Sequence, residues 1–255
     1  MRHYNPMRIS MSSSDLAGKV GVITGGRQGI GRACVDAFVA AGATVVVLDR
    51  GAGEPVPGAA LTLAVDVTDA DAIGAAFERI DLAYGRLDFA VNNAGIDIET
   101  EPAAEWRAEP LDLTVDVNLK GVYHCMRREI SLMRRQGGGS IVNIGSVAAI
   151  VGTPTRAAYA ASKHGVVGLT RSAALEFGKD NIRSNIVCPG GTRTPLLEKV
   201  MTDNPTLREH IAATCPLGRL AEAGEIAEAV LWLASQKASF VNGAVLPVDG
   251  GYTAG

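Results

Sequence analysis

The sequence predicts a doubly wound α/β fold, in which a parallel sheet of about seven strands carries helices on both faces. Short apolar runs alternate with helical patterns from residue 19 onward. These runs show almost no polar alternation, which is typical of parallel strands that are buried on both faces. Because no internal repeat or long linker interrupts the pattern, we expect a single domain over residues 16–255. Residues 1–15 are polar, and we expect a flexible lead-in there.

The predicted strands are short, β-branched runs that end at glycine, proline or an acidic residue. In chain order they lie within residues 19–24, 43–49, 61–67, 86–95, 137–146, 182–191 and 243–251. The predicted helices combine apolar spacing with capping residues, such as Asp69 before one helix and Gly42 after another. They cover residues 31–42, 68–84, 110–136, 156–178 and 223–235, with short helices expected within 195–213.

The stretch from Val20 to Arg50 has the pattern strand, glycine-rich turn, helix, strand. A helix that begins at such a turn offers free N–H groups and partial positive charge to a phosphate. We expect Gly25 to allow the tight turn, Gly29 to allow close approach of a pyrophosphate, and Gly31 to allow close packing of helix on strand. The glycine spacing differs from G-x-G-x-x-G, so by itself this signal is moderate.

Asp49 ends the next strand, where a carboxylate can accept hydrogen bonds from the 2′- and 3′-hydroxyls of a ribose. It would repel the 2′-phosphate of NADP. Arg27 and Arg50 are nearby cations that could serve such a phosphate, although both also suit a solvated surface, and Arg27 suits a pyrophosphate contact. We give Asp49 more weight, so the sequence predicts NAD rather than NADP.

The segment YAASK places Tyr159 and Lys163 one helical turn apart on the same face. A free tyrosine has a pKa near ~10, and an ammonium group beside it favours the phenolate. Ser146 follows the fifth predicted strand, at the sheet edge where open α/β folds bind ligands. Each of these residues alone is weak evidence, whereas the three together predict acid–base chemistry on a hydroxyl group.

Together these motifs resemble the short-chain dehydrogenase/reductase family, whose fold is a single Rossmann-type domain. The resemblance covers residues 16–255. It rests on TGGRQGIG (24–31), DV (66–67), NNAG (92–95), VNLKG (117–121), IGS (144–146), YAASK (159–163), PGGTRT (189–194) and VDGG (248–251). Motifs in this order and at this spacing are highly specific.

The resemblance implies a role for each matching position. Tyr159 would be the general acid/base, Ser146 would hold the substrate oxygen, Lys163 would bind the nicotinamide ribose and lower the Tyr159 pKa, and Asn118 would hold a relay water. The implied cofactor-binding residues are Gly25, Arg27, Gln28, Gly29, Ile30, Gly31, Asp49, Asp66, Val67, Asn93, Ala94, Gly95, Tyr159, Lys163, Pro189, Gly190, Thr192 and Thr194.

The resemblance also implies a substrate pocket that is mostly apolar. Its lining would be Val147, Ala148, Thr153, Pro154, Leu196, Leu197, Val200 and Met201. Arg156 and Arg193 could each supply a cation, or could face solvent. The composition of the pocket favours a neutral secondary alcohol or ketone, such as a cyclic alcohol, a diol, a steroid-like compound or a sugar.

Three functions stay open at this point. The first is an NAD-dependent secondary-alcohol dehydrogenase. The second is a 3-oxoacyl-thioester reductase that uses NADPH and an acyl carrier protein, against which Asp49 argues. The third is a non-catalytic dinucleotide sensor, which typically lacks the tyrosine or the lysine.

Composition narrows the partners. The net charge is −3, and the basic segment 127–135 alternates with apolar residues as a half-buried helix with a solvated face would, so nucleic acid is not expected. No apolar run reaches transmembrane length. The four cysteines form no CxxC pair, so we expect no metal site and a cytoplasmic location. The resemblance and the small residues of 156–178 imply a homo-oligomer, in particular a tetramer.

Overall fold

The computed structural model describes residues 16–51, 53–195, 197–198 and 213–255. Its centre is a sheet of seven parallel strands in the order β3-β2-β1-β4-β5-β6-β9. The strands are β1 (Val20–Thr24), β2 (Thr44–Asp49), β3 (Leu61–Ala64), β4 (Phe89–Asn92), β5 (Gly139–Ile144), β6 (Ile182–Pro189) and β9 (Val245–Val248). The predicted doubly wound sheet is confirmed, because the chain runs outward from β1 to β3, returns to β4 and then runs outward to β9.

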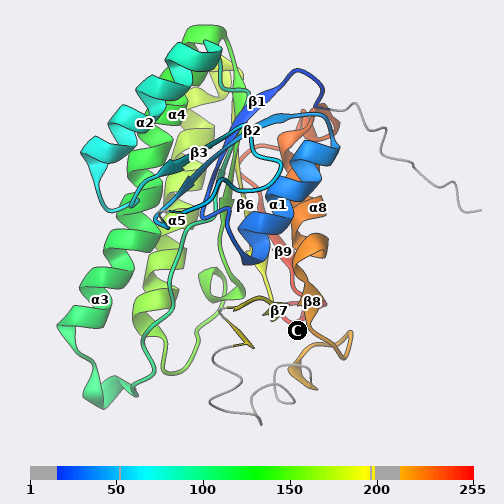
Figure 1. The fold of residues 1–255 in the computed structure, drawn as a ribbon. Coiled ribbons are helices and arrows are strands. Elements are labelled where there is room, and N and C mark those ends of the chain that lie inside the picture. The colour runs from blue at the N-terminus through cyan, green and yellow to red at the C-terminus, as the bar shows by residue number, and fades with distance from the viewer. Residues whose placement is uncertain (1–15, 52, 196, 199–212) are drawn as a thin grey trace, which may run out of the picture.

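Helices cover both faces of this sheet (Figure 1). On one face lie α1 (Gly29–Ala40) and α8 (Ala223–Ala234), which pack on each other. On the other lie α2 (Ala70–Tyr84), α4 (Gly121–Gln136) and α5 (Ala157–Phe177), and α3 (Ala108–Val115) packs on α5. Burial of apolar side chains on both faces explains why the strands carry no polar alternation.

Each face of the sheet has its own apolar core. Beneath α1 and α8, Phe38 stacks against Phe89 of β4, with ring centroids 4.6 Å apart, and Ile226 joins them. Beneath α2, α4 and α5, side chains such as Ile73 and Ile141 are fully buried. Burying a large aliphatic or aromatic side chain contributes roughly 1.5–3 kcal/mol, so these two cores hold the layers together.

The predicted helix over 110–136 is interrupted. The chain forms α3, then a π-helical turn over Asp116–Lys120, then α4. The wider turn inserts one residue into the helix and turns the Asn118 side chain toward the end of β4. A second difference is a small parallel pair, β7 (Thr192–Arg193) with β8 (Ala221–Glu222), which local patterns did not predict.

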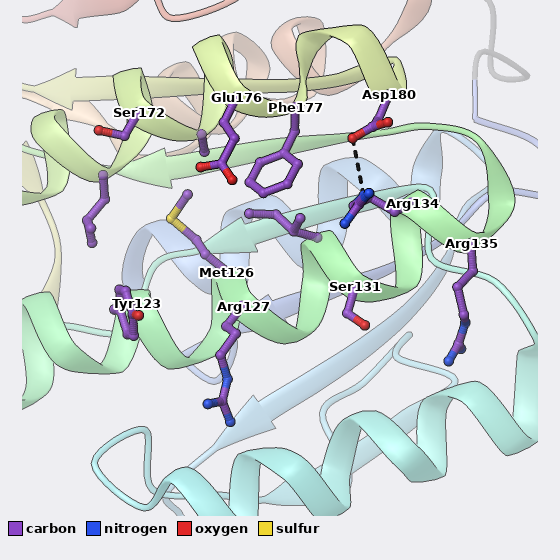
Figure 2. Close-up of a pocket in the computed structure, with 13 residues that line it drawn as sticks. Tyr123, Met126, Arg127, Ser131, Arg134, Arg135, Ser172, Glu176, Phe177 and Asp180 are labelled. Carbon is purple, nitrogen blue, oxygen red and sulfur yellow. Dashed lines mark ion pairs between the residues drawn. The ribbon is translucent and has the colours of Figure 1, made fainter.

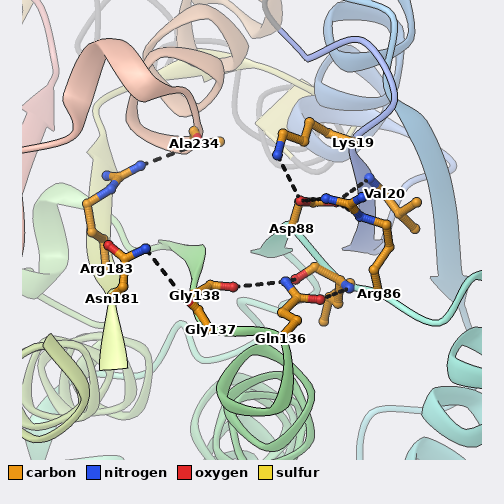
Figure 3. Close-up of polar contacts among 11 residues, drawn as sticks. Lys19, Val20, Arg86, Asp88, Gln136, Gly137, Gly138, Asn181, Arg183 and Ala234 are labelled. Carbon is orange, nitrogen blue, oxygen red and sulfur yellow. Dashed lines mark hydrogen bonds and ion pairs between the residues drawn. The ribbon is translucent and has the colours of Figure 1, made fainter. Parts of the chain in front are cut away.

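The amino edge of the sheet is closed by side chains that bond to backbone groups (Figure 3). Asp88 accepts hydrogen bonds from the Val20 amide at 2.9 Å and from the Arg86 side chain at 2.7 Å. Gln136, the last residue of α4, accepts a hydrogen bond from the Leu87 amide at 2.8 Å. This edge therefore holds strand ends together, and the opposite, carboxyl edge carries the residues that the motifs single out.

Candidate active site

The glycine-rich turn joins β1 to α1. Gly25 and Gly29 have φ angles of 65° and 57°, which glycine adopts without strain. A Cβ on Gly31 would overlap the carbonyl oxygen of Gly25, so only glycine fits where α1 meets the turn. α1 begins at Gly29 with Gln28 as an extended N-cap residue, and its first-turn amides open toward the carboxyl edge. The turn has the form that the sequence predicts for a phosphate site.

Thr24 and Asn93 fasten this turn to the end of β4. The Thr24 hydroxyl oxygen accepts hydrogen bonds from the Asn93 and Ala94 amides at 2.9 and 3.0 Å. The Asn93 side chain donates to the carbonyls of Thr24 and Gly25, both at 3.0 Å. The role of Thr24 was not predicted, because its partner is distant in sequence. Its position before the glycines was the only available signal.

Asp49 lies at the end of β2, beside the glycine-rich turn. Its carboxylate accepts hydrogen bonds from the backbone amides of Arg27 at 3.2 Å and Gly51 at 3.0 Å. The Arg27 side chain lies along it, with Nε 3.7 Å from the carboxylate, and donates to the carbonyl of Glu54 at 2.8 Å. In this arrangement Arg27 flanks Asp49 rather than the helix N-terminus.

Asp66 and Val67 follow β3. The Asp66 carboxylate accepts hydrogen bonds from the Thr68 amide at 2.9 Å and the Thr68 hydroxyl at 2.8 Å. The hydrogen bond from the Thr68 backbone amide is the main reason why the pKa of Asp66 lies below its usual value. Val67 is buried against Gly121 at the start of α4. The pair therefore lies at the carboxyl edge next to β2, on the side of Asp49.

Asn118 is fully buried in the π-helical turn. Its Oδ1 accepts a hydrogen bond from the Ile96 amide at 2.8 Å, and its Nδ2 donates to the Ile96 carbonyl at 2.8 Å and to the Ser162 hydroxyl at 3.2 Å. Both side-chain N–H groups are thus used within the protein. The resemblance leads us to expect a relay water at Asn118. Because both side-chain N–H groups are already used, this water would have to donate a hydrogen bond to a carbonyl oxygen of Asn118.

Ser146, Tyr159 and Lys163 converge at the carboxyl ends of β5 and β6. Ser146 follows β5, and its hydroxyl oxygen accepts a hydrogen bond from the Ala148 amide at 3.1 Å. Tyr159 lies in the first turn of α5, near enough to Ser146 for that hydroxyl to act on the Tyr159 pKa. Lys163 lies one turn further along α5, with its Nζ 5.7 Å from the centroid of the Tyr159 ring. This Nζ donates a hydrogen bond to the Ile144 carbonyl at 2.8 Å.

Burial dominates the electrostatics of this group. It raises the pKa of Tyr159, and the Ser146 hydrogen bond and the charge of Arg156 oppose it only in part. It lowers the pKa of Lys163 to about 8, because an ammonium group loses hydration there. We expected Lys163 to lower the Tyr159 pKa. The net shift is upward because burial outweighs the Ser146 hydroxyl and the charge of Arg156, and Lys163 is not among the groups that shift this pKa.

The segment after β6 closes the site from the other side. Pro189 ends β6, and the Gly190 amide donates to the Val248 carbonyl at 3.1 Å. The buried Thr192 donates its hydroxyl to the Gly190 carbonyl at 3.0 Å. Thr194 lies against the glycine-rich turn, 3.4 Å from the place where a Gly29 Cβ would be. The structure thus brings the Pro189–Thr194 segment to the start of α1.

A buried polar cluster lies beneath the site, and the sequence did not predict it. Glu129 of α4 accepts a hydrogen bond from the Asn92 side chain at 3.1 Å, and Asn92 also donates to Asn143 at 2.9 Å. Asn143 in turn donates to the Thr170 hydroxyl of α5 at 2.9 Å. Glu129 belongs to the basic segment that suggested a solvated face, yet it is fully buried.

Replacing Glu129 with glutamine should remove a pH dependence of stability. Burial raises the pKa of Glu129 from 4.5 to about 8. Between these values the folded protein keeps a proton that the unfolded chain releases, so the free energy of unfolding falls by about 1.4 kcal/mol per pH unit as pH rises. Urea unfolding should therefore show that Glu129→Gln has a free energy of unfolding a few kcal/mol higher than that of wild type at pH 8. At pH 5 the two proteins should be about equally stable. Glu78→Gln on exposed α2 is the control, and equal gains at both pH values would contradict the argument.

No cluster of histidine, cysteine, aspartate or glutamate that could hold a metal occurs among the described residues. All four cysteines are free thiols. The described residues place a half-buried tyrosine, a serine hydroxyl and a buried lysine at the carboxyl edge, next to the glycine-rich turn at the start of α1.

Comparison with known proteins identifies the family of the chain. A family model described as enoyl-(acyl carrier protein) reductase matches residues 25–253. The chain is 43% identical to 2,5-dichloro-2,5-cyclohexadiene-1,4-diol dehydrogenase of Sphingobium indicum, covering 94% of this chain and 99% of that protein. It is 40% identical to cis-4-hydroxycyclohexanecarboxylate dehydrogenase of Sinomonas cyclohexanicum, covering 93% and 98%.

A solved structure shares the architecture as well. Aldohexose dehydrogenase of Thermoplasma acidophilum superposes with a TM-score of 0.89 at 36% identity, covering 95% of this chain and 96% of that one. The match extends over the whole sheet and its helices. The chain therefore belongs to the short-chain dehydrogenase/reductase family, and is an NAD(P)-dependent oxidoreductase that acts on CH–OH groups.

Proposed function

We propose that this protein interconverts a neutral, ring-borne secondary alcohol and its ketone, with NAD as the hydride carrier. The observation that carries the proposal is the convergence of Ser146, Tyr159 and Lys163 beside the glycine-rich turn. The two similar dehydrogenases named above act, by their names, on hydroxyl groups of six-membered carbon rings, and the ring named for the first is uncharged whereas that named for the second bears a carboxylate. A ring alcohol also suits the mostly apolar residues Val147, Ala148 and Pro154, which the resemblance places along the substrate pocket.

The proposed chemistry needs one base and one hydride acceptor. Tyr159, as phenolate, would accept the proton of the substrate hydroxyl, while Ser146 would donate a hydrogen bond to the same oxygen. NAD would supply the acceptor for the hydride that leaves the carbon. Lys163, with a pKa of about 8, carries positive charge at neutral pH and would stabilise the phenolate. Because burial raises the Tyr159 pKa, oxidation should become faster as pH rises.

NAD is proposed over NADP because of Asp49. Its carboxylate is positioned by two backbone amides at the end of β2, where the resemblance places the adenosine ribose. A 2′-phosphate there would meet a negative charge at short range. Arg27 offsets part of that charge from 3.7 Å, so some use of NADP is compatible with the proposal.

Replacing Asp49 with alanine should narrow the preference for NAD. The variant loses the acceptor for the ribose hydroxyls and leaves Arg27 available to a 2′-phosphate. We expect kcat/KM for NAD to fall about tenfold, because the variant lacks one charge-assisted hydrogen-bond acceptor for the ribose. We expect kcat/KM for NADP to rise, because the charge that repels its 2′-phosphate is gone. Steady-state kinetics with both cofactors measure this, with Asp81→Ala on α2 as the control. An unchanged NAD/NADP ratio would refute the role of Asp49.

A 3-oxoacyl-thioester reductase that acts on an acyl carrier protein is the alternative, and the description of the family model names the same kind of carrier for an enoyl substrate. That function predicts NADPH as the reductant and a basic surface for an acidic carrier. Asp49 opposes the first, and the net charge of −3 gives no support to the second.

We also propose a homotetramer that uses the face formed by α4 and α5. A groove of about 710 Å³ lies between these helices, with Tyr123, Met126 and Phe177 among its lining residues (Figure 2). Leu175 on α5 is 88% exposed. A second copy would cover this mixed surface, whose lining also includes Arg127 and Glu176, and a monomeric mass in light scattering would contradict the proposal.

Within the described residues, no helix has the length and apolar character needed to cross a membrane. We propose a cytoplasmic location, which suits four cysteines that remain free thiols. The lead-in over residues 1–15, and the pocket residues Leu196, Val200 and Met201, lie outside the described residues.

The assay that tests the function follows nicotinamide reduction. NAD and NADP are offered in parallel against cyclic alcohols, cyclic diols, sugars and a 3-hydroxyacyl thioester. NAD-dependent oxidation of a ring alcohol supports the proposal, and activity with NADP and the thioester alone would favour the reductase. Nucleotide binding without turnover across the whole panel would favour a sensor.

A further inference from the structure

Two acidic residues that follow β4 hold the first turn of α5. The segment leaves β4 through Gly95 and Ile96 and then carries Asp97 and Glu99. Asp97 forms an ion pair with Arg156, the residue immediately before α5. Glu99 is buried, and its Oε2 accepts a hydrogen bond from the Ala158 amide at 2.7 Å. Neither contact could be predicted from local sequence, since the partners are 59 residues apart.

Asp97, Glu99 and their partners Arg156 and Ala158 form a clamp on the start of α5. This clamp lies next to the candidate catalytic residue Tyr159. Arg156 is the N-cap residue of α5, and its carbonyl accepts a hydrogen bond from the Ala160 amide at 2.9 Å. Tyr159 lies within the helical turn that this hydrogen bond closes. The charge of Arg156 is close enough to act on the Tyr159 pKa. At the other end of the segment, a Cβ on Gly95 would lie 3.5 Å from Lys163 Nζ. The acidic segment therefore passes from Lys163 to the entrance of α5.

The charges of the clamp leave no surplus cation for an anionic substrate. Arg156 contributes one positive charge, and Asp97 and Glu99 together contribute two negative charges. Asp97 is held in this pair by its Oδ2, and only 11% of its side chain is exposed. Arg193, the other arginine near the pocket, lies 3.4 Å from the carboxylate of Glu222. A carboxylate entering here would meet arginines whose charge is already paired with a carboxylate of the protein.

We propose that the Asp97–Arg156 ion pair selects uncharged substrates, by keeping Arg156, which lies near Tyr159, from binding a carboxylate. This inference rests on the proposed function and deepens it, because it names the absence of charge as the property by which the site selects the ring alcohol. The pair acts as a charge filter: Asp97 occupies the guanidinium that a carboxylate substrate would need. Removing the aspartate charge should convert Arg156 into a carboxylate-binding residue.

The test measures binding of two ring probes to the NAD-loaded protein by calorimetry. Cyclohexanol and cyclohexanecarboxylate have similar shape and differ in charge. Wild type should bind the alcohol at least about tenfold more tightly than the carboxylate, the ratio that one charge-assisted contact typically provides. Asp97→Asn keeps the size of the side chain and should strengthen carboxylate binding by about tenfold or more. The double variant with Arg156→Gln should lose that gain.

Asp81→Asn is the matched control, since it removes the aspartate from the exposed Arg135–Asp81 pair far from the site. Equal binding of the two probes by wild type would overturn the proposal, and so would binding of neither. A folded Asp97→Asn protein without the gain would overturn it as well. If that variant fails to fold, the wild-type ratio still decides.

The assay separates this inference from the proposed function. Preference for the alcohol probe without turnover of any ring alcohol would sink the proposed activity and leave the charge filter standing. Turnover of ring alcohols together with equal binding of both probes would sink the filter alone.

Discussion

Replacing Tyr159 with phenylalanine should abolish nearly all turnover while the protein still binds NAD. The hydroxyl is the only group of this side chain that can move a proton, and general acid–base catalysis is worth about 10²–10⁴-fold in rate. We therefore expect kcat to fall about a thousandfold or more. The ring remains, so the packing of the first turn of α5 and the hydrogen bond from Lys163 to Ile144 should persist. Stopped-flow and steady-state kinetics measure the rate, and calorimetry measures NAD affinity.

The matched control is Tyr84→Phe at the end of α2, which removes a tyrosine hydroxyl away from the site. It should leave both quantities unchanged. Rates near wild type in Tyr159→Phe would remove Tyr159 from the mechanism. A loss of NAD affinity equal to the loss of rate would show instead that the hydroxyl serves binding.

Replacing Gly31 with alanine should damage both the cofactor site and the fold. A Cβ at this position overlaps the Gly25 carbonyl oxygen and crowds the Asn93 amide, and both belong to the fastened turn. Overpacking of this kind costs about 1–3 kcal/mol. The turn must also move away from the position in which its amides face a phosphate. We expect NAD affinity to fall at least about tenfold, as loss of about 1.4 kcal/mol of phosphate binding implies.

Gly224→Ala provides the comparison, because this glycine is exposed near the start of α8 and its Cβ would meet open space. Alanine should stabilise that helix by up to about 1 kcal/mol and leave NAD affinity unchanged. Urea unfolding and nucleotide titration of the two variants measure the difference. Identical behaviour would mean that the turn tolerates a side chain at Gly31.

Residues at strand ends were placed well from sequence. Asp49, Ser146 and Pro189 each follow an apolar run, and in a parallel sheet all such ends share one edge. The YAASK segment was placed on one helix for a similarly local reason, since four residues make one turn. In both cases a short-range pattern determines the geometry.

The contacts that sequence did not predict depend on tertiary structure. Glu129 looked like part of a solvated basic face, yet α4 turns it toward Asn92 and the sheet. The π-helical turn around Asn118 follows from its bonds to Ile96, not from helix propensity. The direction of the Tyr159 pKa shift depends on burial, which a spacing of four residues does not encode.

The bonds that fasten the glycine-rich turn set an order of events during synthesis. Asn93 and Ala94 reach Thr24 across 69 and 70 residues. A ribosome adds about 5–20 residues per second, so the turn waits on the order of ten seconds for its partners. Until β2 is made both edges of β1 lack a strand partner, and from then until β4 is made one edge stays unpaired. An unpaired strand edge can associate with another chain, so this edge of the nascent chain stays exposed until residues 89–92 have been made, although the whole glycine motif is complete by then.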